Sequence, residues 1–459
     1  MVAVEKMKEF VDEAISYAEK KTEGVIVRGE IKSGSQIRFS RNAIDIGKQW
    51  ETLTLKAFLI LEGNKTGFTE RSISKKEEVH PLIDDMVKFT KMLPESMVFA
   101  GVEDKVHEYD VIEKNYDEKY DAFVEKAPHL VNSTIDSALE EGAKRVAGAL
   151  KFSKEHAFFR SSYGPEGASQ STQFDLNVRA FQDELDYSGQ GLFCGTIPSE
   201  SESEMIAAGK EAGSLSKKAD GAEQGEPGTY DLILSPTVAA DIIGIIPTSA
   251  NPFMIMIGMS PLGDKMGEQL APEYVNAIDD PRIPQGLGSS AFDFEGTPTE
   301  RTAIIESGVL KNLVHNTSTA KMYETQTTGN SGIISWGSGL KMLLPTYTNI
   351  VFNEGEHSFD EMTETNKSTI YVTCNWYTRF QNYQTGEFST IPRDAMFLIE
   401  DGEMKPIKNL RISDNTLRMF SNIIAMGKDR KQVYWWEVGI PTFIPTVKVE
   451  NCRMSAATQ

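Results

Sequence analysis

The sequence changes its hydrophobic periodicity at one glycine-rich segment, residues 220–228, and this change constrains the fold most strongly. The segment reads DGAEQGEPG and combines three glycines and a proline with polar residues that show no period. Before it, stretches of helical and strand periodicity alternate, and after it short strands and turns dominate. The pattern predicts an N-terminal domain, residues 1–222, which could divide further into 1–110 and 111–222, and a C-terminal domain, residues 223–459.

The N-terminal half shows both periodicities clearly. Met7, Phe10, Ala14 and Ala18 recur at helical spacing and predict an amphipathic helix at the start of the chain. Apolar residues alternate strictly over 53–61 before a Gly-Asn pair, which is typical of a strand that enters a hairpin. The same reasoning predicts strands at 24–31 and 174–181, helices at 82–93 and 201–218, and a helix through 135–150 that begins at the capping candidates Asn132 and Ser133.

The C-terminal half is expected to consist mainly of strands. Short apolar or β-branched runs bounded by turn residues occur at 230–234, 301–305, 369–373 and 446–449. The fold class predicted for the whole chain is therefore α+β, with an N-terminal α/β half that packs helices on a sheet and a C-terminal half of mostly antiparallel β structure.

The charge balance excludes several classes of partner. Lys and Arg number 47 against 67 Asp and Glu, which gives a net charge of -20 and argues against direct binding of nucleic acid or an anionic membrane. No run approaches the ~20 apolar residues that a membrane helix needs. Three widely separated cysteines do not form a disulfide framework, so a reducing cytoplasm is the expected location.

A search for local catalytic motifs finds none. The six histidines never occur at i, i+3 or i+4, and the sequence contains neither HExxH nor HExxxH. No phosphate-binding loop and no GxSxG elbow occurs. Cys194, in GLFCGTIP, is more typical of a small buried apolar residue than of a reactive thiol.

One segment rich in acids, glycine and proline stands out in the C-terminal half. It contains Asp279 and Asp280 and then the run FDFEGTPT over 292–299. A solvated loop between two strands would explain this composition. The same residues could also line a ligand site, because glycines allow a ligand to approach the backbone closely.

This segment also carries a resemblance to a known family. Residues 291–322 resemble the signature D-x-E-G-x-P-x-x-x-x-x-x-I-x-x-G-x-L-K of the TldD/PmbA metallopeptidase family, at Asp293, Glu295, Gly296, Pro298, Ile305, Gly308, Leu310 and Lys311. A T-G-N element at 328–330, a T-G-x-F-S element at 385–389 and a G-x-P element at 439–441 follow in the family's order. Together these elements span nearly the whole C-terminal half.

The resemblance also indicates which branch of the family the chain is similar to. Catalytic TldD-type subunits carry HExxxH, whose two histidines hold zinc, and a cysteine ligand in a later loop. The equivalent stretch here, 231–251, has Gly244, Ile245 and Ser249 at the His, Glu and His positions, and no cysteine occurs over 427–441. Loss of the motif is the pattern of TldE/PmbA-type subunits, so the resemblance implies no catalytic residue and no metal in this chain.

The resemblance further implies a partnership and a substrate. TldE-type subunits pair with a TldD-like catalytic subunit that carries the zinc, and the assembly degrades unfolded peptides or trims leader peptides. The residues expected to bind the peptide, by strand addition, are Phe292, Asp293, Glu295, Gly296, Thr297 and Pro298. The acidic balance makes the family's link to DNA gyrase an indirect one.

Two alternatives remain open from the residues alone. The chain could be an independent regulatory or peptide-binding homodimer without proteolytic activity, or an enzyme whose active site lacks a recognisable motif. A paralogue that carries HExxxH and co-purifies with the chain would distinguish the subunit from the homodimer.

Overall fold

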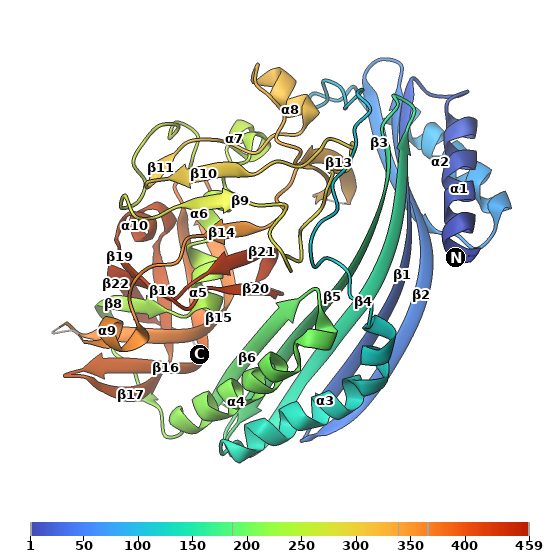
Figure 1. Cartoon of the computed structure of the whole chain (residues 1–459). Helices are drawn as coiled ribbons and strands as arrows, with labels where there is room; N and C mark the ends of the chain where they lie inside the picture. Colours follow the sequence, from blue (N-terminus) through green and yellow to red (C-terminus); the bar gives the residue numbers. More distant parts are fainter. Residues whose placement is uncertain (1, 186, 338, 365–366, 458–459) are drawn as a thin grey trace.

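The computed structural model describes residues 2–185, 187–337, 339–364 and 367–457, in which a long curved sheet faces a strand-rich C-terminal half (Figure 1). The curved sheet has six strands in the order β3-β2-β1-β4-β5-β6, all antiparallel to their neighbours. These strands are β1 Gly24–Ser40, β2 Ala43–Leu61, β3 Lys65–Ser72, β4 Arg145–Ser161, β5 Glu166–Phe181 and β6 Ser188–Gly195.

Four helices cover one face of this sheet. They are α1 Val2–Ala18, α2 Val79–Met92, α3 Tyr120–Glu140 and α4 Glu202–Lys218, and 3-10 helices occur at Lys76–Glu78 and Pro198–Glu200. The alternating residues of the strands bury one apolar set beneath α1 and α2, including Val25 and Leu59, and a second beneath α3 and α4, including Leu150 and Phe174. Burial of these two sets stabilises the helices on the sheet, since propensity alone contributes little.

The other face of the sheet points toward the C-terminal half. Ile26, Phe58, Phe68 and Phe159 of this face pack against Phe292 of the C-terminal half. Farther along the same face the side chains become charged, with Arg28 and Glu30 on β1 and Lys56 on β2. This change from apolar to charged side chains leaves a polar cavity next to the packed region.

The C-terminal half contains an eight-stranded sheet and a second, six-stranded sheet. The eight-stranded sheet comprises β7 Glu223–Gln224, β8 Gly228–Leu234, β15 Thr369–Asn382, β16 Glu387–Glu400, β17 Glu403–Lys408, β18 Leu410–Asn415 and β22 Val447–Ala456, with β19 Ile423–Met426 paired to β22. The six-stranded sheet comprises β9 Ala277–Asp279, β10 Thr302–Glu306, β11 Val309–Leu310, β14 Ile350–Phe352, β20 Lys431–Trp435 and β21 Val438–Ile444. A separate hairpin pairs β12 Ser331–Trp336 with β13 Leu340–Pro345.

The largest hydrophobic core lies between these two sheets and holds the short helices in place. It includes Leu232 of β8, Ile304 of β10, Phe420 and Val449. The helices of this half are α5 Pro236–Ile242, α6 Ile245–Thr248, α7 Pro252–Met256, α8 Thr317–Met322, α9 Phe359–Thr363 and α10 Thr416–Ser421. Among the described residues, no helix is both long and apolar enough to cross a membrane.

The predicted α+β fold class is confirmed, with an α/β N-terminal region and a β-rich C-terminal region. The predicted helix through 135–150 is wrong in its bounds. The helix begins at Tyr120, so Asn132 and Ser133 lie in its interior, and it ends at Glu140 before Gly142, whose φ is +102°. Val146 and Leu150 belong to β4, because a spacing of four residues satisfies a strand period as well as a helical one.

Candidate functional site

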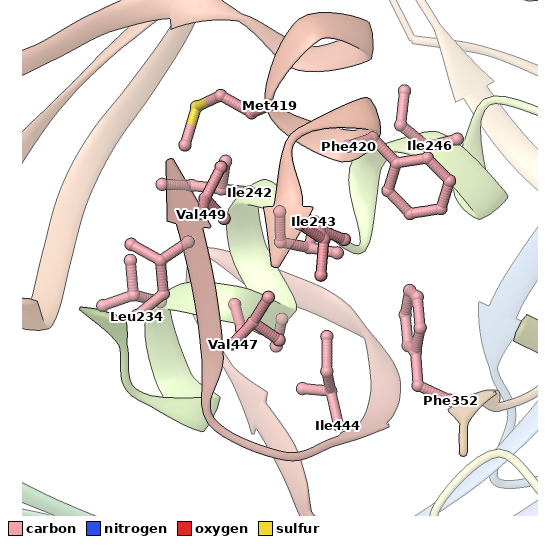
Figure 2. Packing of buried hydrophobic residues seen from close by; sticks show 14 of the residues in the cluster. Leu234, Ile242, Ile243, Ile246, Phe352, Met419, Phe420, Ile444, Val447 and Val449 are labelled. Carbon is pink, nitrogen blue, oxygen red and sulfur yellow. The ribbon is translucent and has the colours of Figure 1, made fainter. Parts of the chain in front are cut away.

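The positions that the family resemblance aligns with the zinc motif lie at and around α6, which follows α5: Gly244 precedes α6, Ile245 begins it and Ser249 follows it. Ser235 caps α5 by accepting the amide of Val238, and Pro236 follows at the first helical position. Ile242, Ile243 and Ile246 point into the core against Phe420 and Val449 (Figure 2). These buried anchors fix the orientation of both short helices, and with it the direction in which the intervening positions face.

The side chains at the three aligned positions do not form a donor set for zinc. Gly244 has none, and a Cβ placed there would lie 2.2 Å from the backbone oxygen of Ala240. Ile245 is apolar, and the Ser249 hydroxyl already donates to the Ile245 carbonyl at 2.7 Å. Zinc in proteins is bound by imidazole, thiolate and carboxylate groups, so these positions do not fit the metal.

Among the described residues, no other group of donors takes the place of the missing ones. Over the part of the chain that the structure describes, no three His, Cys, Asp or Glu side chains are grouped closely enough to hold a metal ion. Cys194, Cys374 and Cys452 are all buried and free, and burial raises the pKa of the Cys194 thiol to about 12. A thiol with that pKa carries almost no thiolate at neutral pH, which agrees with the apolar role predicted for Cys194.

A buried polar network is centred on Asp241 of α5, about one helical turn before Gly244. Asp241 accepts hydrogen bonds from the Asn375 amide and the Thr378 hydroxyl of β15, and both of these side chains also contact Thr390 of β16. Burial raises the pKa of Asp241 to about 6. This network was not predicted from the sequence, because Asp241 lies among apolar residues and its partners are more than 130 residues away.

The second candidate region is the acid- and glycine-rich loop over 292–299, which folds into a tight turn. Oδ1 of Asp293 accepts the amides of Glu295 and Thr297, at 2.9 and 3.0 Å, while Oδ2 accepts the Ser331 amide at 2.8 Å. An isolated bridge pairs Phe292 with Pro298 across the turn. The Asp293 carboxylate therefore determines the shape of the loop and fixes it to β12.

Glu295 and Gly296 join this loop to the N-terminal half. Glu295 is fully buried and accepts the amide of Glu103, and burial raises its pKa to about 7. Gly296 adopts a φ of +88°, and a Cβ there would lie 2.6 Å from the ring of Phe159. The Tyr109 hydroxyl donates to the Gly296 carbonyl at 2.6 Å. Glu295 and Gly296 thus lie where the two halves approach each other closely. This close approach requires glycine at position 296.

The T-G-N element at 328–330, which also resembles the family, packs against this loop. Gly329, with a φ of +67°, lies directly against the backbone of Pro298, and Asn330 donates to the Asp279 carboxylate at 2.6 Å. Asp279 also accepts the amide and hydroxyl of Thr348, and burial raises its pKa to about 6. The T-G-N element and the acid-rich segment, widely separated in sequence, therefore form one buried cluster.

A cavity of about 390 Å³ lies beside this cluster, between it and the curved sheet. Phe292 and Asp293 line it from the loop, and Arg28, Glu30 and Lys56 line it from β1 and β2. Glu30 forms ion pairs with Arg28 and Lys56, at 2.9 and 2.7 Å. Burial alone would raise the pKa of Glu30, but the two cations outweigh it and hold this pKa below the ordinary value. The Tyr347 hydroxyl at the cavity wall is buried without a hydrogen-bond partner among the described residues.

The six residues expected to bind peptide occupy different positions in this arrangement. Phe292 and Asp293 border the cavity, whereas Glu295, Gly296, Thr297 and Pro298 lie within the turn. The turn is not the exposed strand edge that strand addition requires, because its amides are already paired within the loop and to β12. The charged sheet residues on the opposite wall were not predicted, although Arg28 and Glu30 alternate in the sequence.

The comparison with known families agrees with this architecture. The profile of the PmbA/TldA metallopeptidase C-terminal domain matches residues 227–456, which is half of the chain. The chain belongs to the TldD/PmbA metallopeptidase family. A metalloprotease of Methanocaldococcus jannaschii is 25% identical over 390 residues, covering 81% of this chain and 83% of that protein. The metalloprotease PmbA of Escherichia coli O157:H7 is 29% identical over 171 residues, covering 36% and 34%.

Solved structures of similar fold cover nearly the whole chain. TldE from Thermococcus kodakarensis superposes with a TM-score of 0.82 and 19% identity, covering 97% of this chain and 100% of that one. A Thermotoga maritima protein named as a modulator of DNA gyrase superposes with a TM-score of 0.80 and 23% identity, covering 98% and 100%. At these identities the likeness shows that the fold is shared.

Proposed function

We propose that this TldD/PmbA family member is the non-catalytic, TldE-type subunit of a two-subunit zinc peptidase that acts on unfolded peptides or leader peptides. The observation that carries the proposal is the donor chemistry of the three positions at and around α6. Gly244, Ile245 and Ser249 supply one neutral hydroxyl, which is already hydrogen-bonded, where the family's catalytic members carry two histidines and a glutamate.

The partner in this proposal is a TldD-like chain that carries HExxxH and holds the zinc. Zinc with three protein ligands and one open position activates a water molecule for hydrolysis, and this chain offers no such ligand set at the aligned positions. We expect the pair to form in the cytoplasm, since three free cysteines suit a reducing compartment.

The peptide-binding role of the loop belongs to the same proposal in a modified form. The cavity bordered by Phe292 and Asp293, rather than the turn itself, is the place where a peptide would enter this subunit. Its wall presents three cations, three carboxylates and the Tyr347 hydroxyl, which has no hydrogen-bond partner among the described residues, and these groups suit the polar backbone of an extended peptide.

Co-expression tests the proposal. The chain and the HExxxH paralogue of its own organism should co-purify, and cleavage of an unstructured peptide should require both chains. Substitution of the paralogue's motif glutamate should abolish cleavage without releasing this chain. Peptide cleavage by this chain alone, or complete failure to associate, would contradict the proposal.

A further inference from the structure

The outer face of the eight-stranded sheet carries an array of arginines that form no ion pair with a carboxylate among the described residues. The inner face of β16, β18 and β22 buries Phe388, Ile412 and Met454 in the core. On the outer face the register places Arg411 directly opposite Ser455, and Ser389 opposite Ser413. Directly opposed residues in antiparallel strands point to the same side, so these four side chains share the outer face.

Hydrogen bonds confirm the shared orientation. The Arg411 guanidinium donates to the Ser389 hydroxyl at 3.1 Å, and the hydroxyls of Ser413 and Ser455 lie 2.8 Å apart. Arg453, two residues before Ser455 on β22, lies on the same face by the strand alternation. Arg379 of β15 lies directly opposite Ser389 of β16 and therefore also lies on this face. Arg379 and Arg453 are exposed, and Arg411 is half-buried.

An aromatic group continues this face at its edge. The guanidinium of Arg393 lies 4.2 Å from the ring centre of Trp376, and that of Arg379 lies 4.2 Å from the ring centre of Tyr377. Trp436 packs near Trp376 with 63% of its surface exposed. We call this set of residues the arginine face: Trp376, Tyr377, Arg379, Arg393, Arg411, Trp436 and Arg453.

The charge of the arginine face contrasts with that of the chain, whose net charge is -20. Among the described residues, none of its four arginines has a carboxylate within 4 Å. Asp394, beside Arg393, is already bound by Arg179 and Ser188. Glu387, two residues before Ser389 at the start of β16, shares this face, and Glu437 accepts the amide of Tyr377. Elsewhere the outer face is covered, by α4 against Ala395 and Phe397 and by α9 against Tyr371.

We propose that the arginine face is the surface on which the catalytic partner subunit docks, and that the partner presents carboxylates to it. This inference rests on the proposed function. Trp, Tyr and Arg are the residues that dominate the binding energy of protein interfaces, and arginine binds carboxylates through two parallel hydrogen bonds.

A second copy of this chain fits the face poorly. A two-fold symmetric dimer through this surface would place the same patch of both copies against itself. Four arginines of one copy would then face four of the other, and like charges opposed across an interface are unfavourable. The charge pattern therefore selects a different, acidic surface.

The test compares two triple variants that change the charge equally. In the face variant, Arg379, Arg411 and Arg453 are each changed to Glu. In the control variant, Lys20→Glu, Lys91→Glu and Lys126→Glu alter exposed lysines of the helical layer that have no ion pair among the described residues. A third variant, with Arg379, Arg411 and Arg453 each changed to Gln, removes the charge without reversing it and guards against misfolding of the Glu variant. Circular dichroism and the unfolding temperature verify that each variant is folded.

The affinity for the HExxxH paralogue is then measured. The face variant should bind at least about tenfold more weakly than wild type, the Gln variant should be intermediate, and the control should match wild type. Wild-type affinity should also fall as NaCl rises to about 0.5 M. If the Glu and Gln face variants are folded and bind the paralogue with wild-type affinity, the arginine face is not the docking surface. That result would not affect the proposed function. Failure of the wild-type chain to bind the paralogue would instead overturn the proposed function, and this inference with it.

Discussion

The Asp293 carboxylate accepts the Ser331 amide at 2.8 Å while its other oxygen holds two amides of its own loop. This single side chain shapes the loop and fixes it to β12. The next carboxylate, Glu295, reaches the Glu103 amide in the segment that follows α2. Two acids separated by one residue thus connect three parts of the chain, and the pH dependence of folding should report on them.

Stability is predicted to fall as the pH rises from about 4.5 to about 7. Burial raises the pKa of Glu295 from 4.5 to about 7, so the folded state holds its proton over this window while the unfolded state releases it. The contribution of Glu295 should be at most about 1.4 kcal/mol per pH unit. Denaturant unfolding of wild type and Glu295→Gln at several pH values measures it. The Gln variant should become more stable relative to wild type across the window, and a constant difference would contradict the assignment.

Gly296 is predicted to tolerate no side chain. Gly296→Ala combines a positive φ of +88° with a Cβ 2.6 Å from Phe159 and 2.9 Å from Pro165. Gly63→Ala is the matched control, because Gly63 has a φ of +78° and nothing within 4 Å. Each should lose about 1 kcal/mol or more to backbone strain, and Gly296→Ala should lose roughly 1–3 kcal/mol more through overpacking. Equal unfolding free energies for the two variants would exclude the contact with Phe159.

The purified chain alone is predicted to bind no stoichiometric zinc. Glycine, isoleucine and a hydrogen-bonded serine at 244, 245 and 249 offer the ion no competent ligand. Elemental analysis of protein purified without chelators or a histidine tag measures the content. About one zinc per chain, lost on substitution of a histidine, would refute this prediction.

Restoring the motif is predicted not to restore activity. The triple variant Gly244→His, Ile245→Glu and Ser249→His introduces two histidines, but three protein ligands are the rule at catalytic zinc. The first histidine would force its Cβ to within 2.2 Å of the Ala240 carbonyl, so α5 would have to shift. Pro247 also lies within α6 inside the motif and has no amide to donate there. Zinc titration followed by a peptide cleavage assay tests this, and zinc-dependent turnover by the variant alone would reveal a latent active site.

Local patterns predicted the regular elements well because their signals lie within one segment. The apolar stripe through Met7 and Phe10 marks α1, and the strict alternation over 53–61 marks the end of β2. The helix predicted through Val146 and Leu150 failed because their spacing fits both periods. Contacts between distant segments could not be predicted in this way. The hydrogen bonds that Asn375 donates to Asp241, and Asn330 to Asp279, depend on tertiary packing that no local pattern encodes.

At the candidate site, too, local sequence patterns predicted the segment involved but not its contacts with distant residues. The acid- and glycine-rich segment was identified from its composition and its resemblance to the family, and the structure places it at the junction of the two halves. The segment was expected to present an open strand edge to a peptide. In the structure, Asp293 instead accepts two amides of the same loop. The charged wall of the cavity comes from Arg28 and Glu30 of β1 and from Lys56 of β2, which become neighbours only when these two strands pair.

The central claim is that this chain supports catalysis by a partner and performs none itself. The most direct measurement is peptide cleavage and zinc content for this chain, the HExxxH paralogue and their mixture, at matched concentrations. We expect association, about one zinc per complex carried by the paralogue, and cleavage only when both chains are present. Zinc-dependent cleavage by this chain in isolation would contradict the account, as would full activity of the paralogue without it.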